Sequence, residues 1–110
     1  MSARSPRIPP LPRDEWTDDA RDAFAYWEGP TAWENGSRSN TMMTLAQHPR
    51  LAIASNDFGK YILVEANLTP RQREIIVLRV AWRFHSDHQW THHVLSARKI
   101  GMTEDELSDL

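Results

Sequence analysis

The stretch Leu68–Leu107, LTPRQREIIVLRVAWRFHSDHQWTHHVLSARKIGMTEDEL, decides the fold because it contains several helix boundary signals in close succession. Thr69 is a good N-cap, a proline follows it at the first helical position, and the hydrogen-bond acceptors Gln72 and Glu74 come soon after. The run that ends at Trp82 is apolar nearly all round. It therefore predicts a helix in the centre of the fold.

Two further helices follow in the same stretch. One is expected from about Asp87 to Ile100, where Gly101 closes it. The next begins with Thr103 as N-cap and Glu106 as its capping-box partner.

The residues before this stretch also favour helices. Thr17 can cap a short helix over TDDARDAFAYW, which has acidic residues in its first turn. A loop rich in Gly, Asn, Ser and Pro spans residues 28–40, and a second helix starts near Thr41 and stops before Pro49. Pro49 opens a third helix that runs to about residue 66. Its apolar residues fall at helical spacing: Leu51, Ala54, Phe58 and Ile62.

These patterns predict an all-α protein, since no segment has the alternation typical of a strand. Residues 1–16 carry most of the prolines and are expected to form an extended arm over a neighbouring surface. Residues 17–110 are expected to form one small helical domain.

Composition excludes several classes of function. The net charge is −2 and there is no basic stripe, so a nucleic-acid partner is not expected. No apolar run approaches the roughly 20 residues of a membrane span, and the start does not resemble a signal peptide. The chain has no cysteine, which excludes disulfides, thiolate ligands and thiol redox chemistry. A cytoplasmic location is the default expectation.

The stretch RFHSDHQWTHH, Arg83–His93, holds four of the five histidines. At about 100° per residue, His93 shares the inward face of its helix with Trp90. Ser86, Val94 and Ala97 lie on that face too, Gln89 lies on its flank, and three histidines point outward: His85, His88 and His92.

The outward histidines have i, i+3 and i+7 spacing, which would suit a zinc ion, but Gln89 stands where the zincin motif has its Glu. A solvated helix face is the favoured interpretation, and no native metal site is expected.

His93 is the candidate for chemistry, because an imidazole on a buried face can exchange a proton when a second group orients it. Glu74 on the preceding helix is the expected partner, since a carboxylate beside an apolar stretch is costly unless bonded. The alternative is a core histidine with structural partners and a Glu74 that merely closes the capping box.

Arg79 is expected to point at packed structure, where a guanidinium needs a carboxylate. An ion pair with Glu65 or an N-terminal acid is the favoured partner, and a substrate carboxylate is the alternative.

The segment LTPRQREIIVLRVAW, a short polar joint and DHQWTHHVLSARKIGMTEDEL together resemble the carboxymuconolactone decarboxylase family, which includes the alkyl hydroperoxidase D branch. The upstream NTMMTLAQHPRLAIASNDFGKYIL and RIPPLPRDEW are similar to the segments that precede this motif. Glu74, His93, Ala97 and Gly101 keep the family's relative spacing.

The resemblance implies two chemistries. In the peroxidase branch a Cys-x-x-Cys pair lies between the Glu and the His, but Ser86 and Gln89 occupy those positions here, so a peroxidase label for the family could not apply. In the decarboxylase branch it implies cofactor-free loss of CO2 from a lactone acid. His93 and Glu74 would then be catalytic, and Ser86, Gln89 and Arg79 would bind substrate. Gln89 often has a Glu counterpart in that branch, so this transfer is incomplete.

The resemblance also implies a homo-oligomer, a trimer or hexamer, with pockets near the interfaces. It implies several more helices after the motif, so this chain is expected to lack the family's C-terminal helices. Three interpretations stay open: a decarboxylase-type enzyme, a non-catalytic ligand-binding or assembly protein, and a metal-binding protein using the outward histidines.

Overall fold

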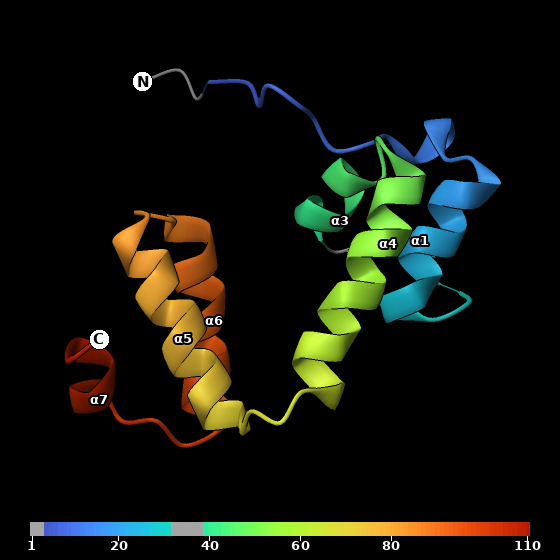
Figure 1. Cartoon of the computed structure of the whole chain (residues 1–110). Helices are drawn as coiled ribbons and strands as arrows, with labels where there is room; N and C mark the ends of the chain where they lie inside the picture. The colour runs from blue at the N-terminus through green and yellow to red at the C-terminus, as the bar shows by residue number, and fades with distance from the viewer. Residues whose placement is uncertain (1–3, 32–38) are drawn as a thin grey trace. The chain divides into compact units, whose positions relative to one another are not determined.

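The computed structural model describes residues 4–31 and 39–110, and every regular element among them is helical (Figure 1). The all-α prediction is therefore confirmed. The chain divides into two compact units, Met1–Val64 and Glu65–Leu110. Residues 32–38 of the predicted loop and residues 1–3 of the predicted arm lie outside the described residues.

The described residues of the first unit form a 3-10 turn, three helices and a π-helical turn that reaches the unit's end. The elements are η1 (Arg13–Glu15), α1 (Asp18–Glu28), α3 (Asn40–Leu45), α4 (Pro49–Lys60) and η2 (Tyr61–Glu65). Thr17 caps α1 as predicted, since its side chain accepts a hydrogen bond from the N–H of Ala20. The third predicted helix is shorter than expected, because its last turn changes from α to π geometry after Lys60.

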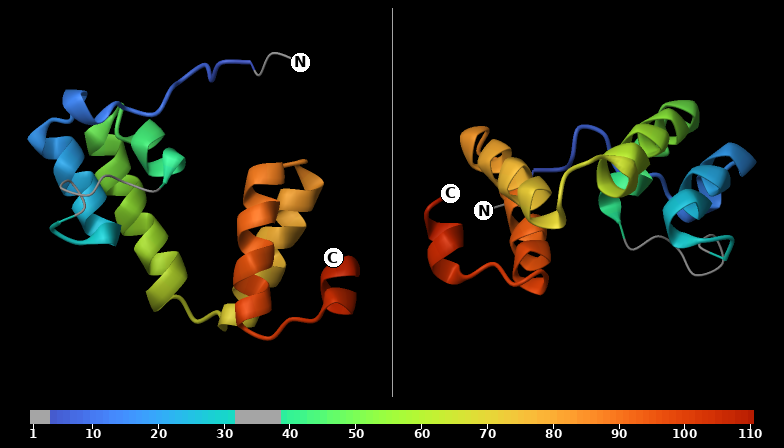
Figure 2. Two further views of the ribbon diagram at one scale, coloured as in Figure 1. Left: turned by 180° about the vertical axis from the view of Figure 1, so that it is seen from behind. Right: turned by 60° about the horizontal axis from the view of Figure 1, so that its bottom comes forward.

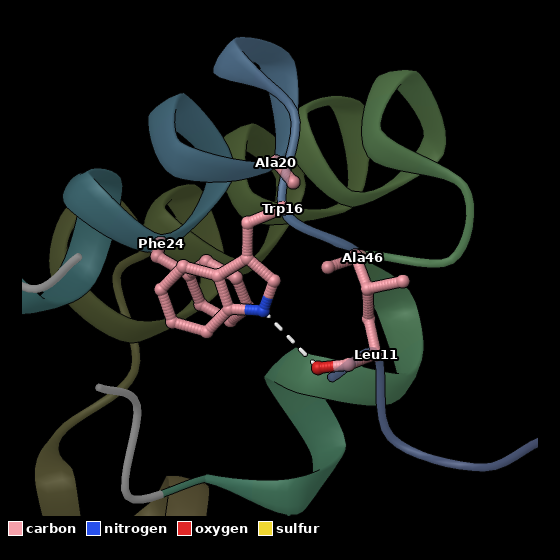
Figure 3. Packing of buried hydrophobic residues seen from close by; sticks show 5 residues of the cluster. All are labelled: Leu11, Trp16, Ala20, Phe24 and Ala46. Atoms are coloured by element: carbon pink, nitrogen blue, oxygen red, sulfur yellow. Dashed lines mark hydrogen bonds between the residues drawn. The ribbon is translucent and has the colours of Figure 1, made fainter. Parts of the chain in front are cut away.

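The end of the proline-rich segment is part of the core of this unit (Figure 3). Leu11 and Trp16 are buried against Phe24, and the Trp16 and Phe24 rings stack with centroids 4.1 Å apart. The Trp16 indole N–H donates to the Leu11 carbonyl at 3.1 Å, while the Leu11 N–H donates to the Met43 carbonyl. The described residues before Leu11 form no helix and are mostly exposed, so the core of this unit begins at Leu11.

Helix α4 packs on α1 through a face that does not contain its large apolar residues. Ala52 and Asn56 are buried, and the Asn56 amide accepts from the Trp27 indole at 2.8 Å and donates to the Ala23 carbonyl at 3.0 Å. The helical spacing of Leu51, Ala54, Phe58 and Ile62 was sound as a helix signal, yet all four residues are exposed. A small residue and a hydrogen-bonding amide fit the close contact with α1 better than large aliphatic groups do.

The second unit consists of α5 (Pro70–Arg83), α6 (Asp87–Lys99) and α7 (Glu104–Ser108). Helices α5 and α6 run antiparallel side by side, joined by a short turn, and both views in Figure 2 agree on this. The predicted capping boxes are confirmed at Thr69 with Gln72 and at Thr103 with Glu106. Gly101, at φ 89°, follows the end of α6, where a left-handed residue is common.

The expectation that α5 is central was wrong for this unit. Its buried residues Glu74, Leu78 and Ala81 recur at i, i+4 and i+7, so one face is covered. That face meets α6 and the buried pair Met102 and Leu107. The apolar residues elsewhere on α5 are exposed: Ile76, Val80 and Trp82.

Within the described residues, no helix combines the length and the apolar character needed to cross a membrane.

Candidate functional site

Glu74 and His93 meet between the two long helices of the second unit. The Glu74 Oε2 and His93 Nδ1 atoms lie 2.7 Å apart, a short hydrogen bond. Glu74 is only 3% exposed, whereas the His93 side chain keeps 23% of its surface. The pair therefore joins a buried carboxylate on α5 to a partly exposed imidazole on α6.

The N-terminal turn of α5 explains why Glu74 is available for this contact. The Gln72 side chain accepts from the Thr69 N–H at 3.0 Å, and the Thr69 hydroxyl accepts from the Gln72 N–H at 3.2 Å. Since Gln72 completes the capping box, Glu74 is not its partner. The alternative in which Glu74 merely closes the box is wrong.

Arg73 is a second partner of Glu74 that sequence reasoning missed. Its Nε lies 3.5 Å from Glu74 Oε1, and its side chain is 19% exposed. Adjacent residues on a helix do not face each other, so a pairing rule based on spacing gives no hint of this contact. The two Glu74 oxygens are thus divided between a guanidinium and an imidazole.

The tautomer of His93 follows from its partner. An ionised carboxylate only accepts hydrogen bonds, so Nδ1 carries the hydrogen that is donated to Glu74. Nε2 has no partner among the described residues, which leaves it able to accept a proton. Trp90 and Val94, which share the inward face of α6 with His93, are partly buried and pack on the apolar cluster that contains Leu78 and Ala97.

Ser86 and Gln89 precede His93 on α6 at i−7 and i−4. Ser86 is the N-cap residue, but its hydroxyl makes no capping hydrogen bond. It lines a hollow of about 110 Å³ together with Trp82, His85 and Trp90. Gln89 is exposed. The Ser86 hydroxyl is therefore uncommitted, which a hydroxyl at an N-cap usually is not.

Arg79 does not point at packed structure, contrary to expectation. It is exposed, and its guanidinium donates to the backbone oxygen of Leu110 rather than to an Asp or Glu side chain. The physical reason is its position on α5, because the covered face repeats through Glu74, Leu78 and Ala81 and Arg79 lies outside that repeat. The structure therefore does not bring Arg79 to the Glu74–His93 pair.

The outward histidines are exposed, as their helical positions predicted. His88 and His92 lie edge to face with ring centroids 4.5 Å apart. Among the residues that the structure describes, no three His, Asp or Glu side chains are grouped so that they could hold a metal ion.

Two exposed ion pairs hold α7 on this unit. Arg98 Nε lies 2.7 Å from Glu104 Oε1, and this hydrogen bond lowers the pKa of Glu104 and raises that of Arg98. The Arg71 guanidinium, followed by the Thr103 backbone N–H, lowers the pKa of Glu106. Leu107 is thereby kept in the apolar cluster beneath α6.

Comparison with known proteins gives a family but no individual relative. No curated protein and no solved structure matches the chain. The carboxymuconolactone decarboxylase family matches residues 49–110, which include α4 and the whole of the second unit. Because this match covers more than half of the sequence and contains both Glu74 and His93, the chain belongs to the carboxymuconolactone decarboxylase family.

Proposed function

We propose that the protein transfers a proton to or from a small carboxylic or lactone acid at His93, without a cofactor, and that the reaction is a decarboxylation. One observation carries the proposal. The buried Glu74 carboxylate lies 2.7 Å from Nδ1 of the partly exposed His93 and leaves Nε2 without a partner among the described residues. Nε2 is also accessible, because the described residues contain no buried side-chain nitrogen without a hydrogen-bond partner, and proton exchange with a substrate requires such access.

The proposed chemistry follows from this geometry. In a lactone acid the bond between the ring carbon and its carboxylate breaks, CO2 leaves, and the electron pair stays on carbon as an enolate. A protonated Nε2 of His93 then delivers its proton to that carbon. Glu74 is a positioning residue, which holds the ring in one orientation and stabilises the imidazolium.

Two other residues support substrate binding. The uncommitted Ser86 hydroxyl lies two helical turns before His93, and the Gln89 amide lies one turn before it. Both groups can hydrogen-bond a lactone oxygen. Arg79 is the weaker candidate, because its guanidinium already donates to the Leu110 backbone oxygen.

Peroxidase chemistry is not part of the proposal. Ser86 and Gln89 stand where that branch of the family carries its thiols, and the chain has no cysteine. A hydroxyl has no comparable redox cycle.

The test compares two neighbouring histidines on α6. His93→Gln and His92→Gln make the same chemical change, but His92 is exposed and outward. With carboxymuconolactone as substrate, we expect His93→Gln to lower turnover at least about 100-fold and His92→Gln to leave it unchanged. Equal turnover by the two variants, both folded by circular dichroism, contradicts the proposal.

A second outcome would favour a non-catalytic ligand-binding or assembly role. In that case the lactone acid binds without turnover, and His93→Gln does not change its affinity. Gln89 motivates this alternative, since an amide cannot act as acid or base where the decarboxylase branch often has Glu.

We further propose a homo-oligomer, a trimer or hexamer, and a cytoplasmic location. Native mass spectrometry of the untagged chain tests the assembly, and a monomer would contradict it.

A further inference from the structure

The corner where α5 ends forms an open hollow that contains neither Glu74 nor His93, although the weaker substrate-binding candidate Arg79 lines it. It has a volume of about 700 Å³, within the range of small-molecule sites, and six residues line it: Arg79, Val80, Trp82, Arg83, Phe84 and His85. We propose that this hollow binds planar unsaturated or aromatic carboxylates.

The charge of the hollow fits an anion. Arg79 and Arg83 lie one turn apart on α5, so their guanidinium groups are on the same side of the helix. Arg83 has no partner among the described residues, and no carboxylate is among the residues that line the hollow. A guanidinium presents paired N–H donors that match the two oxygens of a carboxylate.

The aromatic residues of the hollow fit a planar ligand. Trp82 is 62% exposed and Phe84 is 77% exposed, although both side chains are strongly apolar. The Trp82 and Trp90 ring centroids also lie 5.9 Å apart, and Trp82 lines the hollow. Rings at this position can contact the face of a flat ligand whose carboxylate meets Arg83.

The backbone at this corner is unusual as well. His85 has φ 52°, in the left-handed region, and the other described residues with positive φ are Gly29 and Gly101. Histidine is among the residues found there, but the conformation still costs about 1 kcal/mol or more. Strain of this kind often accompanies a functional site. Here it places His85 in both the large hollow and the small one that contains Ser86.

This inference does not depend on turnover at His93, because neither Glu74 nor His93 lines the hollow. The probes are benzoate, benzamide, cyclohexanecarboxylate and inorganic phosphate. Binding is followed by NMR titration of the Trp82 indole N–H, which Trp82→Phe assigns. We expect benzoate to bind with a dissociation constant of about 1 mM or tighter, and the other three to bind more weakly.

Matched variants decide the outcome. Arg83→Gln should weaken benzoate binding about tenfold, whereas Lys99→Gln, an equal change of charge at an exposed position of α6, should not. Phe84→Ala should make benzoate and cyclohexanecarboxylate equivalent. The His93→Gln variant should bind benzoate normally even if it has lost turnover, so failure of the two proposals can be told apart.

Three results would overturn the inference. The first is benzoate binding that Arg83→Gln and Lys99→Gln weaken equally, which would indicate only general charge attraction. The second is phosphate binding as tight as benzoate binding, which would indicate an anion site without aromatic recognition. The third is the absence of any saturable shift of the Trp82 indole resonance.

Discussion

Among the described residues each unit buries one polar side chain, and the two differ in whether every polar atom of the resulting hydrogen-bond network has a partner. In the first unit the Asn56 amide is 3% exposed and satisfied at both ends, by the Trp27 indole and the Ala23 carbonyl. In the second unit Glu74 is equally buried, but its partner His93 keeps Nε2 without a partner among the described residues. A closed network holds helices together, whereas an open one leaves an atom available for chemistry.

The largest expected effect in this comparison is a fall in kcat when Glu74 loses its charge but keeps its shape. Glu74→Gln keeps an oxygen to accept from His93 Nδ1 but removes the negative charge. We expect kcat for carboxymuconolactone to fall roughly 10- to 100-fold with KM unchanged, because the imidazolium loses its counter-charge. Steady-state kinetics measures this split.

The same substitution places an amide N–H2 group beside the Arg73 guanidinium, so it should also lower the free energy of unfolding by about 1–3 kcal/mol, and kcat is therefore compared well below the melting temperature. If kcat falls only because the variant is partly unfolded at the assay temperature, the positioning role of Glu74 is contradicted. Glu65→Gln, the same change at an exposed position, is the control.

The next effect concerns stability in the first unit. Asn56→Ala removes both hydrogen bonds and leaves the Trp27 indole N–H and the Ala23 carbonyl without their partner. We expect a loss of about 2–3 kcal/mol in the free energy of unfolding, with kcat unchanged well below the melting temperature. Asn67→Ala, at an exposed position, should cost far less. Urea unfolding followed by tryptophan fluorescence measures both variants.

The sequence predicted local structure well, because helix caps depend on residues only three positions apart. Thr17, Thr69 and Thr103 all cap the helices expected of them. The helical position of His93 and its pairing with Glu74 could also be anticipated, since α5 and α6 are consecutive and joined by a short turn.

The covered faces of α4 and α5 could not be predicted, since they depend on tertiary contacts that helical spacing alone does not encode. The large apolar residues of α4 suggest a covered face, yet the packing on α1 selects Ala52 and Asn56 instead. Arg79 was misplaced for the same reason, and the contact of Arg73 with Glu74 depends on side-chain rotamers that no periodicity encodes.

A smaller effect is expected at the left-handed residue His85. The positive-φ residues are Gly29 in the described part of the first unit, and Gly101 and His85 in the second unit, so His85 is the described case that is not a glycine. His85→Gly relieves the strain but adds disorder to the unfolded chain, so we expect a gain of about 0.5 kcal/mol. His88→Gly, within α6, should instead cost about 0.3–0.5 kcal/mol, the difference in helix propensity between histidine and glycine. Thermal unfolding of the two variants should thus show shifts of opposite sign, and shifts of the same sign contradict the strain at His85.

The smallest effect is the response of α7 to acid. The pKa values of Glu104 and Glu106 are lowered in the folded chain by their hydrogen bonds to Arg98 and Arg71. Their stabilising contribution is therefore complete above the ordinary glutamate pKa of 4.5 and is lost as the pH falls through the lower folded values. Hydrogen exchange of the α7 amides should therefore accelerate below this pKa, relative to the α5 amides, after correction for the intrinsic pH dependence.

Glu106→Gln provides the internal test, because it gives α7 the Thr–Gln capping box that α5 already has and removes one of the two titrating charges. The acid response of α7 should then weaken without disappearing, since Glu104 and Arg98 remain paired; an unchanged response would mean that the Glu106 charge does not help to hold α7 in place.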